Sequence, residues 1–217
     1  MTTRQTGDGF DAVAPLPYTA IDTHDDLVAW SRAYAAYAVD AYGMAVDLDR
    51  VDWAVSTRAK RRAAAVKQAR IPDASVGVPV DWDRVVREHG PAYADRHDAD
   101  PGDVRRCTVV LTWAAYEAYD RTEWTETLRH ELVHVEQFQR YAATGHGDEF
   151  KRRARAVDAG LRCRTFATAK YRVTCEDCGK VVARRYRACR LTREPGRHRS
   201  RCCGAPVAVE RVESGND

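Results

Sequence analysis

Two histidines and a glutamate in the middle of the chain have the spacing of a catalytic metal site. The segment reads His130-Glu131-Leu132-Val133-His134. In a helix the second histidine is rotated by about 400° from the first, so both imidazoles project from one side, one turn apart, as two ligands of a tetrahedral Zn²⁺ must. Glu131 lies about 100° round the helix from the first histidine and about 60° from the second. It can therefore reach a water molecule on the metal without being a ligand, which suits a general base.

A third histidine follows at a distance that allows it to complete the site. His146 lies between Gly145 and Gly147, and two glycines let the chain reverse after the helix and return an imidazole to the metal. Three histidine ligands leave the fourth position open for water, which is typical of a catalytic site rather than a structural one. The alternative is a helix that carries two unrelated histidines on a solvated face. The position of the motif within an amphipathic segment favours the metal site.

Five of the seven cysteines lie in the last 43 residues and predict a second zinc site, because clustered cysteines without a secretion signal usually bind metal. Cys175-x-x-Cys178 followed by Gly179 has the spacing of a zinc knuckle. Cys203 is the favoured third ligand because Gly204 follows it in the same way. A regular second knuckle would place a cysteine at position 200, where this chain has a serine. The fourth ligand is therefore one of three residues: Cys202, His198 or Cys189. Free thiols in a basic tail are the alternative.

Periodicity assigns the elements around the first motif. Residues 122–143 have apolar side chains within a narrow arc at about 100° per residue, which predicts a helix anchored in the core. A further helix is expected over residues 148–159, and a buried strand over residues 107–113. An earlier helix is expected to begin after Thr23, as its N-cap, and to stop at Gly43.

Three other segments have less regular patterns. Alternation over residues 51–55 predicts a strand, and a second extended run after the basic cluster at 58–62 would pair with it as a hairpin, although the alanines there would suit a helix equally. Residues 71–105 are rich in proline and glycine, which predicts a long, broken connection with one short helix at 82–88. The first twenty residues show no periodicity and are expected to form a loose leader.

The formal net charge of +3 averages two unlike parts of the chain. Residues 1–150 carry 17 Lys and Arg against 25 Asp and Glu, whereas residues 151–217 carry 18 against 7. A basic segment of this density is typical of proteins that bind a polyanion, most commonly nucleic acid, and a solvated charged surface is the alternative. The apolar stretches are too short to cross a membrane and the first residues lack a secretory signal, so we expect a soluble cytoplasmic protein, associated with the nucleoid if it binds DNA.

Together these motifs resemble the SprT-like family of zinc metalloproteases, which includes the Spartan-type DNA–protein crosslink proteases. The resemblance rests on H-E-L-V-H, on His146 in G-H-G-x-x-F after eleven intervening residues, on the basic helix and on the cysteine-rich segment. It implies an α+β fold with a zincin-like domain over residues 21–168, built on the HExxH helix and a small antiparallel sheet. A leader at 1–20 would precede this domain, and a basic zinc-ribbon-like module over 169–217 would follow it. The resemblance also implies that the three histidines hold the catalytic zinc and that Glu131 is the base.

The leading hypothesis is a zinc endopeptidase that acts on proteins bound or crosslinked to DNA. It implies one catalytic and one structural Zn²⁺, a protein substrate, DNA bound by the basic C-terminal part, and no membrane. The second hypothesis is a non-catalytic DNA- or chromatin-binding protein in which zinc supports folding, and the third is binding of RNA or a transcription complex. Glu131 favours the first hypothesis, because a purely structural site needs no base beside its ligands.

Overall fold

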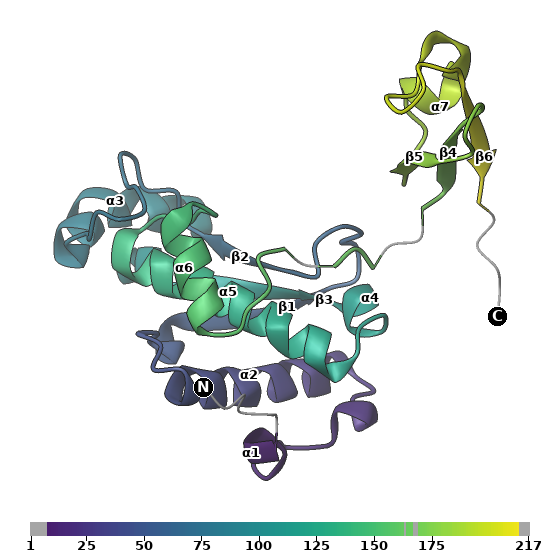
Figure 1. Ribbon diagram of the computed structural model, residues 1–217. Coiled ribbons are helices and arrows are strands. Elements are labelled where there is room, and N and C mark those ends of the chain that lie inside the picture. Colours follow the sequence, from purple (N-terminus) through teal and green to yellow (C-terminus); the bar gives the residue numbers. More distant parts are fainter. Residues whose placement is uncertain (1–7, 163, 167–168, 213–217) are drawn as a thin grey trace. The chain divides into compact units, whose positions relative to one another are not determined.

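The computed structural model of the chain describes residues 8–162, 164–166 and 169–212. It has a mixed α/β architecture and divides into two compact units, Met1–Phe166 and Ala167–Asp217, each with its own three-stranded sheet (Figure 1). Within the described residues, every helix is either too short or too polar for a membrane-spanning segment.

The sheet of the first unit has β3 (Cys107–Thr112) at its centre, with β1 (Val51–Ser56) parallel to it and β2 (Ala64–Gln68) antiparallel. Three alternate residues of β3 are at most 2% exposed, whereas both outer strands mix buried and exposed residues. The most apolar strand therefore takes the position that has a neighbour on each side. The expected hairpin of β1 and β2 is wrong, because β3 lies between them, and the expected antiparallel pairing holds only for β2 with β3. A one-turn helix, α4 (Trp113–Tyr116), follows β3 directly.

The helix that carries the first motif, α5 (Arg121–Tyr141), contacts α2, α6, β2 and β3. Its first turn is closed by a capping box, in which Asp120 accepts from the backbone of Glu123 at 2.8 Å and Glu123 accepts from the backbone of Asp120 at 3.2 Å. Its last turn ends at Ala142, which has a left-handed φ of 51°. Fourteen of its 21 residues are buried, so the helix is enclosed on most sides. The helix predicted for this segment is confirmed.

Two further helices lie against α5. The first, α2 (His24–Ala41), has the predicted capping box at Thr23 and ends just before Gly43, as expected. The second, α6 (Asp148–Ala156), ends three residues earlier than expected. Asp158 adopts a left-handed φ of 51° there, and its carbonyl accepts two hydrogen bonds from the Arg129 guanidinium, at 3.2 and 2.7 Å.

Residues 8–20 pack against α2 instead of forming a loose leader. Phe10 of the short helix α1 (Asp8–Asp11) is fully buried. Its ring contacts three aromatic rings of α2 at centroid distances of 5.0 to 5.6 Å: Trp30, Tyr34 and Tyr37. A single phenylalanine in a segment without periodicity gives no pattern from which this anchoring could be predicted. Residues 1–7 of the expected leader lie outside the described residues.

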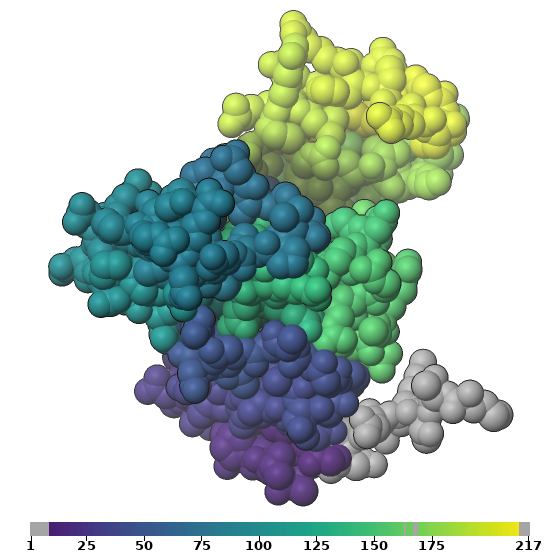
Figure 2. Space-filling model, turned by 90° about the vertical axis from the view of Figure 1, so that its left-hand side faces the viewer, coloured from purple at the N-terminus to yellow at the C-terminus, as the bar shows by residue number. Residues whose placement is uncertain are grey.

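The connection between β2 and β3 contains a longer helix than expected. This helix, α3 (Trp82–His97), continues through the glycine and proline that we expected to end it. A Cβ on Gly90 would lie 2.7 Å from the backbone oxygen of Pro101, so the glycine here allows close packing of the following segment rather than a turn. The indole of Trp82 donates to the backbone oxygen of Gln139 at 2.6 Å, which attaches α3 to the end of α5. Figure 2 shows the α3 segment, in blue, beside the green surface of the later elements.

In the second unit, β4 (Tyr171–Cys175) pairs antiparallel with β5 (Val181–Arg185) on one side and with β6 (Val207–Arg211) on the other. A one-turn helix, α7 (Arg190–Arg193), lies between β5 and β6 in the chain. Of the described residues in this unit, three with apolar side chains are buried: Val173, Cys175 and Val207. So small an apolar core usually needs a metal ion or a cross-link to hold the fold.

The basic charge of the C-terminal third is divided between the two units. Residues 151–166, on and after α6, carry six Lys and Arg against one Asp and belong to the first unit. Residues 167–217 carry 12 Lys and Arg against 6 Asp and Glu, a net charge of +6. The basic segment seen in the composition therefore belongs to two units rather than to one.

Candidate metal centre

Three imidazoles converge at the middle of α5. His130 and His134 lie one turn apart on the helix and are 5% and 7% exposed, and His146 comes from the connection between α5 and α6. Nε2 of His146 lies 3.2 Å from Nε2 of His130 and 3.1 Å from Nε2 of His134. Nitrogen ligands at about 2.0–2.1 Å from a tetrahedral zinc ion lie about 3.3 Å from one another. The three rings are therefore spaced as ligands of such an ion, and they could bind a metal.

The ring nitrogens that point away from this centre are hydrogen-bonded to oxygen atoms. Nδ1 of His130 lies 2.7 Å from the backbone oxygen of Gly160, and Nδ1 of His134 lies 3.3 Å from Oε1 of Gln137. Both oxygens can only accept, so each Nδ1 carries the proton and each Nε2 keeps its lone pair for a metal. Burial and the charges of the other two histidines lower the pKa of His134 to about 3, and burial lowers the pKa of His130. The neutral rings that result are the form that binds metal.

Gln137 joins the motif helix to the segment that carries the third histidine. It is 2% exposed, its Oε1 accepts from the backbone of Gly145 at 3.1 Å, and its Nε2 donates to Glu149 at the start of α6. Phe150 lies under all three imidazoles at ring-centroid distances of 4.6 to 4.8 Å. The sequence analysis missed Gln137. Its place three residues after His134, on the same side of the helix, was the available signal, but a glutamine has too many uses for spacing to single it out.

Glu131 is buried on the same helix as His130 and His134, at 4% exposure. Burial raises its pKa to about 7, although a hydrogen bond from the backbone of Val66 and the charge of Arg62 act in the opposite direction. The carboxyl group opens onto a cleft of about 610 Å³ that the three histidines also line. A carboxylate with a pKa near neutrality can take a proton from water and release it again, as a general base must.

In the second unit, four cysteines converge: Cys175, Cys178, Cys202 and Cys203. Their sulfur atoms lie within 4.8 Å of one another, and Sγ of Cys178 is 3.6 Å from Sγ of Cys202. Thiolates at about 2.3 Å from a tetrahedral zinc ion lie about 3.8 Å apart. This cluster could also bind a metal ion, and it contains each of the three cysteines chosen from the sequence.

The backbone explains why the fourth sulfur comes from Cys202. The turn after Cys175 is closed by a hydrogen bond from Gly179 N to its carbonyl at 2.9 Å, and the turn after Ser200 by one from Gly204 N at 3.0 Å. Both glycines have a left-handed φ, of 68° and 67°. Ser200 thus occupies the first position of a second knuckle, where its hydroxyl lies 3.1 Å from Cys175 Sγ and lowers the pKa of that thiol to about 6. The neighbouring Cys202 supplies the donor that a serine at this position does not.

The other candidates for this site lie elsewhere. Cys189 caps α7, where its sulfur accepts from the Thr192 hydroxyl at 4.0 Å, and neither Cys189 nor His198 belongs to the sulfur cluster. Cys107 is buried in β3, where burial raises its pKa to about 12, as suits a small core side chain. Cys163 lies outside the described residues.

The sequence profile of the SprT-like family matches residues 36–172. The chain belongs to the SprT-like family. The matched SprT-like region contains the three histidines, Glu131 and Gln137, and it ends before the first cysteine of the sulfur cluster. No curated protein and no solved structure shows significant similarity to the chain.

We expect Cys202→Ser to remove one equivalent of metal from the full-length protein, because only three of the four sulfur donors remain. Metal content of the purified protein, measured by inductively coupled plasma mass spectrometry, checks this. Cys189→Ser is the matched control, since its sulfur lies outside the cluster, and it should keep the wild-type content. If Cys189→Ser lost one equivalent of metal and Cys202→Ser lost none, the fourth donor would be Cys189.

Glu131→Gln should stabilise the metal-stripped protein at high pH. Burial raises the pKa of Glu131 from 4.5 to about 7, so the folded state holds this proton more tightly than the unfolded state does. The stability that follows is complete below the unfolded pKa and is lost as pH rises through about 7. Glutamine has no proton to lose, so the variant should exceed wild type by up to about 3 kcal/mol at pH 8 and by little at pH 5.

Tryptophan fluorescence during urea unfolding in a chelator measures this difference, because all five tryptophans lie in the first unit. The control is Glu126→Gln, an exposed position of the same helix, which should change stability little at either pH. A difference between Glu131→Gln and wild type that does not grow with pH would contradict a buried, titrating carboxyl at this position.

Proposed function

We propose that the chain is a zinc-dependent endopeptidase with a zincin-like first unit, and that it acts on DNA-associated proteins. One observation carries the peptidase part of this proposal: a buried carboxyl with a raised pKa lies beside three convergent imidazoles at a cleft. Three histidine ligands leave a position for water, and a neighbouring base is needed only where that water reacts.

In this proposal each residue of the site has a separate role in the reaction. His130, His134 and His146 would hold the zinc ion through Nε2, oriented by the Gly160 carbonyl and the Gln137 amide. When bound, the ion supplies a Lewis acid that polarises the scissile carbonyl and lowers the pKa of water. Glu131 accepts the proton of the attacking water and passes it to the leaving amine, so no covalent intermediate with the protein forms.

The second candidate function is a non-catalytic DNA- or transcription-complex-binding protein. The four-cysteine cluster and the small apolar core of the second unit favour this use for the second unit alone, as a zinc-ribbon-like module held by a structural zinc. The buried carboxyl in the first unit favours catalysis there, because an acid that is only partly compensated lowers stability and a purely structural site has no use for it.

The DNA-associated part of the proposal rests on the charge of the second unit. Arg184 and Arg185 on the outer strand β5, and Arg187 just after it, are exposed. Among the described residues, none of the three forms an ion pair with a carboxylate, so their guanidinium groups can contact phosphates. Contacts of this kind carry no sequence information, and binding with little base preference follows. In this proposal the protein works in the cytoplasm at the nucleoid.

Glu131→Gln should lower cleavage of a protein crosslinked to DNA by at least about 10²-fold while both metal equivalents remain, because only the base is lost. Cleavage is followed by gel electrophoresis with and without DNA, and metal content is measured on the same samples. His134→Ala should lose about one equivalent together with activity, and Glu126→Gln should match wild type. Wild-type turnover by zinc-loaded Glu131→Gln would exclude Glu131 as the base.

Reversal of three charges on β5 and its flank, Arg184→Glu, Arg185→Glu and Arg187→Glu, should weaken binding of duplex DNA and reduce its salt dependence. Each lost phosphate contact should lower the slope of log affinity against log salt by about 0.9. Fluorescence anisotropy of a labelled duplex measures the affinity and its salt dependence. Salt concentrations between 50 and 200 mM are suitable, because affinity changes steeply over this range. The matched control reverses three exposed arginines of α3, at positions 84, 87 and 96, and has the same net charge. If both triple variants changed DNA affinity and its salt dependence equally, the arginines on and after β5 would not be a specific DNA-binding site.

A further inference from the structure

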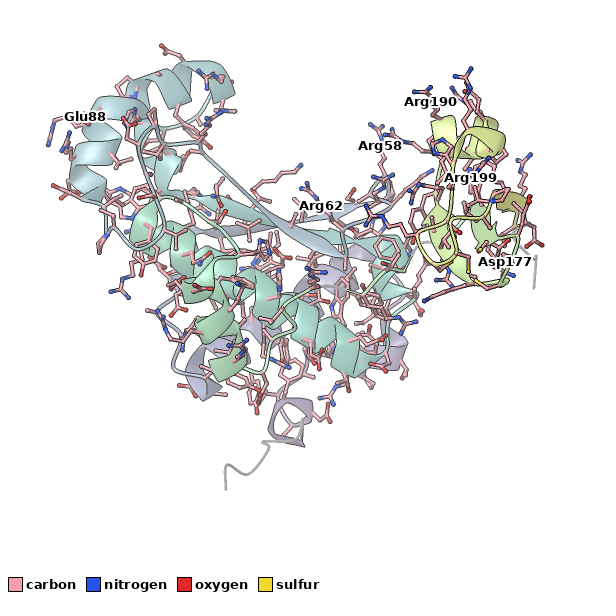
Figure 3. All side chains as sticks on the ribbon, turned by 45° about the horizontal axis from the view of Figure 1, so that its top comes forward. Arg58, Arg62, Glu88, Asp177, Arg190 and Arg199 are labelled. Carbon is pink, nitrogen blue, oxygen red and sulfur yellow. The ribbon has the colours of Figure 1, made fainter. Side chains whose placement is uncertain are left out.

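The cleft beside the three histidines and Glu131 is also lined by arginines from two separate segments. Arg61 and Arg62 come from the connection between β1 and β2, and Arg162 comes from the segment after α6. Figure 3 labels Arg62, together with Arg58 of the same connection. Glu131 is the one acidic residue among those that line the cleft. Three arginines therefore line the cleft against one carboxyl group, before any metal charge is added.

The guanidinium groups of the cleft are not engaged in ion pairs within the part of the chain that the structure describes. Among the described residues, Arg61, Arg62 and Arg162 form no ion pair, and all three are exposed. Elsewhere in the unit, arginines on several elements pair with carboxylates at 2.6 to 3.0 Å: Arg50, Arg84, Arg105, Arg106 and Arg153. Three unpaired guanidinium groups around one cleft leave its charge available to a ligand.

The charge of the cleft acts on the position where substrate would react. Arg62 lines the same cleft as Glu131 and the three histidines. A carboxylate on a bound chain would meet the same field and could accept two parallel hydrogen bonds from one guanidinium. An ammonium group in the same place would be repelled by the arginines and by the metal ion.

The shape of the cleft favours a peptide over a nucleic acid as the source of the negative charge. Residues 64–66 of β2 line it, and β2 is an outer strand whose second edge pairs with none of the described strands. An extended peptide can pair with such an edge, and its alternate side chains then project toward the walls. The volume of about 610 Å³ suits a short segment of one chain.

We propose that the cleft selects peptide segments with Asp or Glu next to the scissile bond, and that Arg61, Arg62 and Arg162 are the residues that select them. This inference rests on the proposed endopeptidase function and names the substrate class of the same site. It makes the three arginines specificity-determining residues, whereas the histidines and Glu131 would act on any bound segment.

The preference for acidic peptides is tested by measuring peptide binding and peptide cleavage separately. Full-length, zinc-loaded Glu131→Gln protein is titrated into fluorescein-labelled ten-residue peptides that differ only in carrying Glu, Gln or Lys at the four central positions. We expect the Glu peptide to bind at least about 10-fold more tightly than the Gln peptide, and the Lys peptide to bind least.

The arginine variants are made in the same Glu131→Gln protein. Arg61→Glu with Arg62→Glu, or Arg162→Glu alone, should remove the preference for the Glu peptide or reverse it toward the Lys peptide. Arg58→Glu makes the same charge change as Arg162→Glu, but outside the cleft, and should leave the preference intact. Tryptophan fluorescence checks that each variant is folded, and Arg61→Gln with Arg62→Gln provides a milder replacement that should abolish the preference without reversing it.

The outcomes separate this inference from the proposed function. If wild-type protein cleaves the three peptides at equal rates and Glu131→Gln binds them equally, the acidic preference is overturned while the endopeptidase function stands. If the Glu peptide binds with the expected preference but neither peptide nor protein is cleaved, the endopeptidase function is overturned and the binding preference stands. If an oligothymidine of ten nucleotides displaces the Glu peptide from the cleft at equal concentration, the cleft is a nucleic-acid site and the peptide proposal is overturned.

Discussion

The first unit depends on holding three ring nitrogens closer together than neutral imidazoles would remain without support. Nε2 of His146 lies within 3.2 Å of Nε2 in both other rings, and lone pairs at this distance repel unless a cation lies between them. The surrounding structure opposes the repulsion from outside, through the Gly160 carbonyl on one ring and Gln137 on another, with Phe150 packed under all three. An enclosed, capped helix is the element that can hold two of the rings this rigidly.

The same enclosure makes Glu131 costly to stability and useful to chemistry. Water would solvate its carboxylate better than the interior does, and one backbone hydrogen bond with one nearby guanidinium only partly replaces that solvation. A leucine of similar size would remove the cost and with it any group able to move a proton. The cost of an acid at this buried position therefore supports the proposed role of Glu131 as a base, since packing of the helix does not need it.

Local spacing predicted which three histidines converge, whereas the strand pairing and the helix lengths depend on contacts between distant segments. The four-residue interval in α5 and the two glycines around His146 act within one short segment, so the sequence alone brings these three side chains together. The pairing of β1 with β3, rather than with β2, depends on which strand is most apolar on both faces, a comparison between distant segments. A glycine followed by a proline predicts the end of a helix. The reason for Gly90 is instead its close contact with the backbone of Pro101, which a local pattern does not reveal. The sequence left the fourth donor of the sulfur cluster open among three residues, because Ser200 stands where a knuckle cysteine would and the fourth sulfur comes from the residue before Cys203.

The proposed peptide and DNA sites both rest on unpaired arginines, so charge alone cannot assign a different anion to each. Arg61, Arg62 and Arg162 surround a cleft with a strand edge along it, and a strand edge offers backbone hydrogen bonds that an extended peptide can use and a phosphate chain cannot. Arg184 and Arg185 lie instead on an exposed outer strand, where a long polyanion can contact several guanidinium groups in succession. In this proposal Coulomb attraction would bring either anion to either group of arginines, and the backbone beside each group would determine which of them is retained.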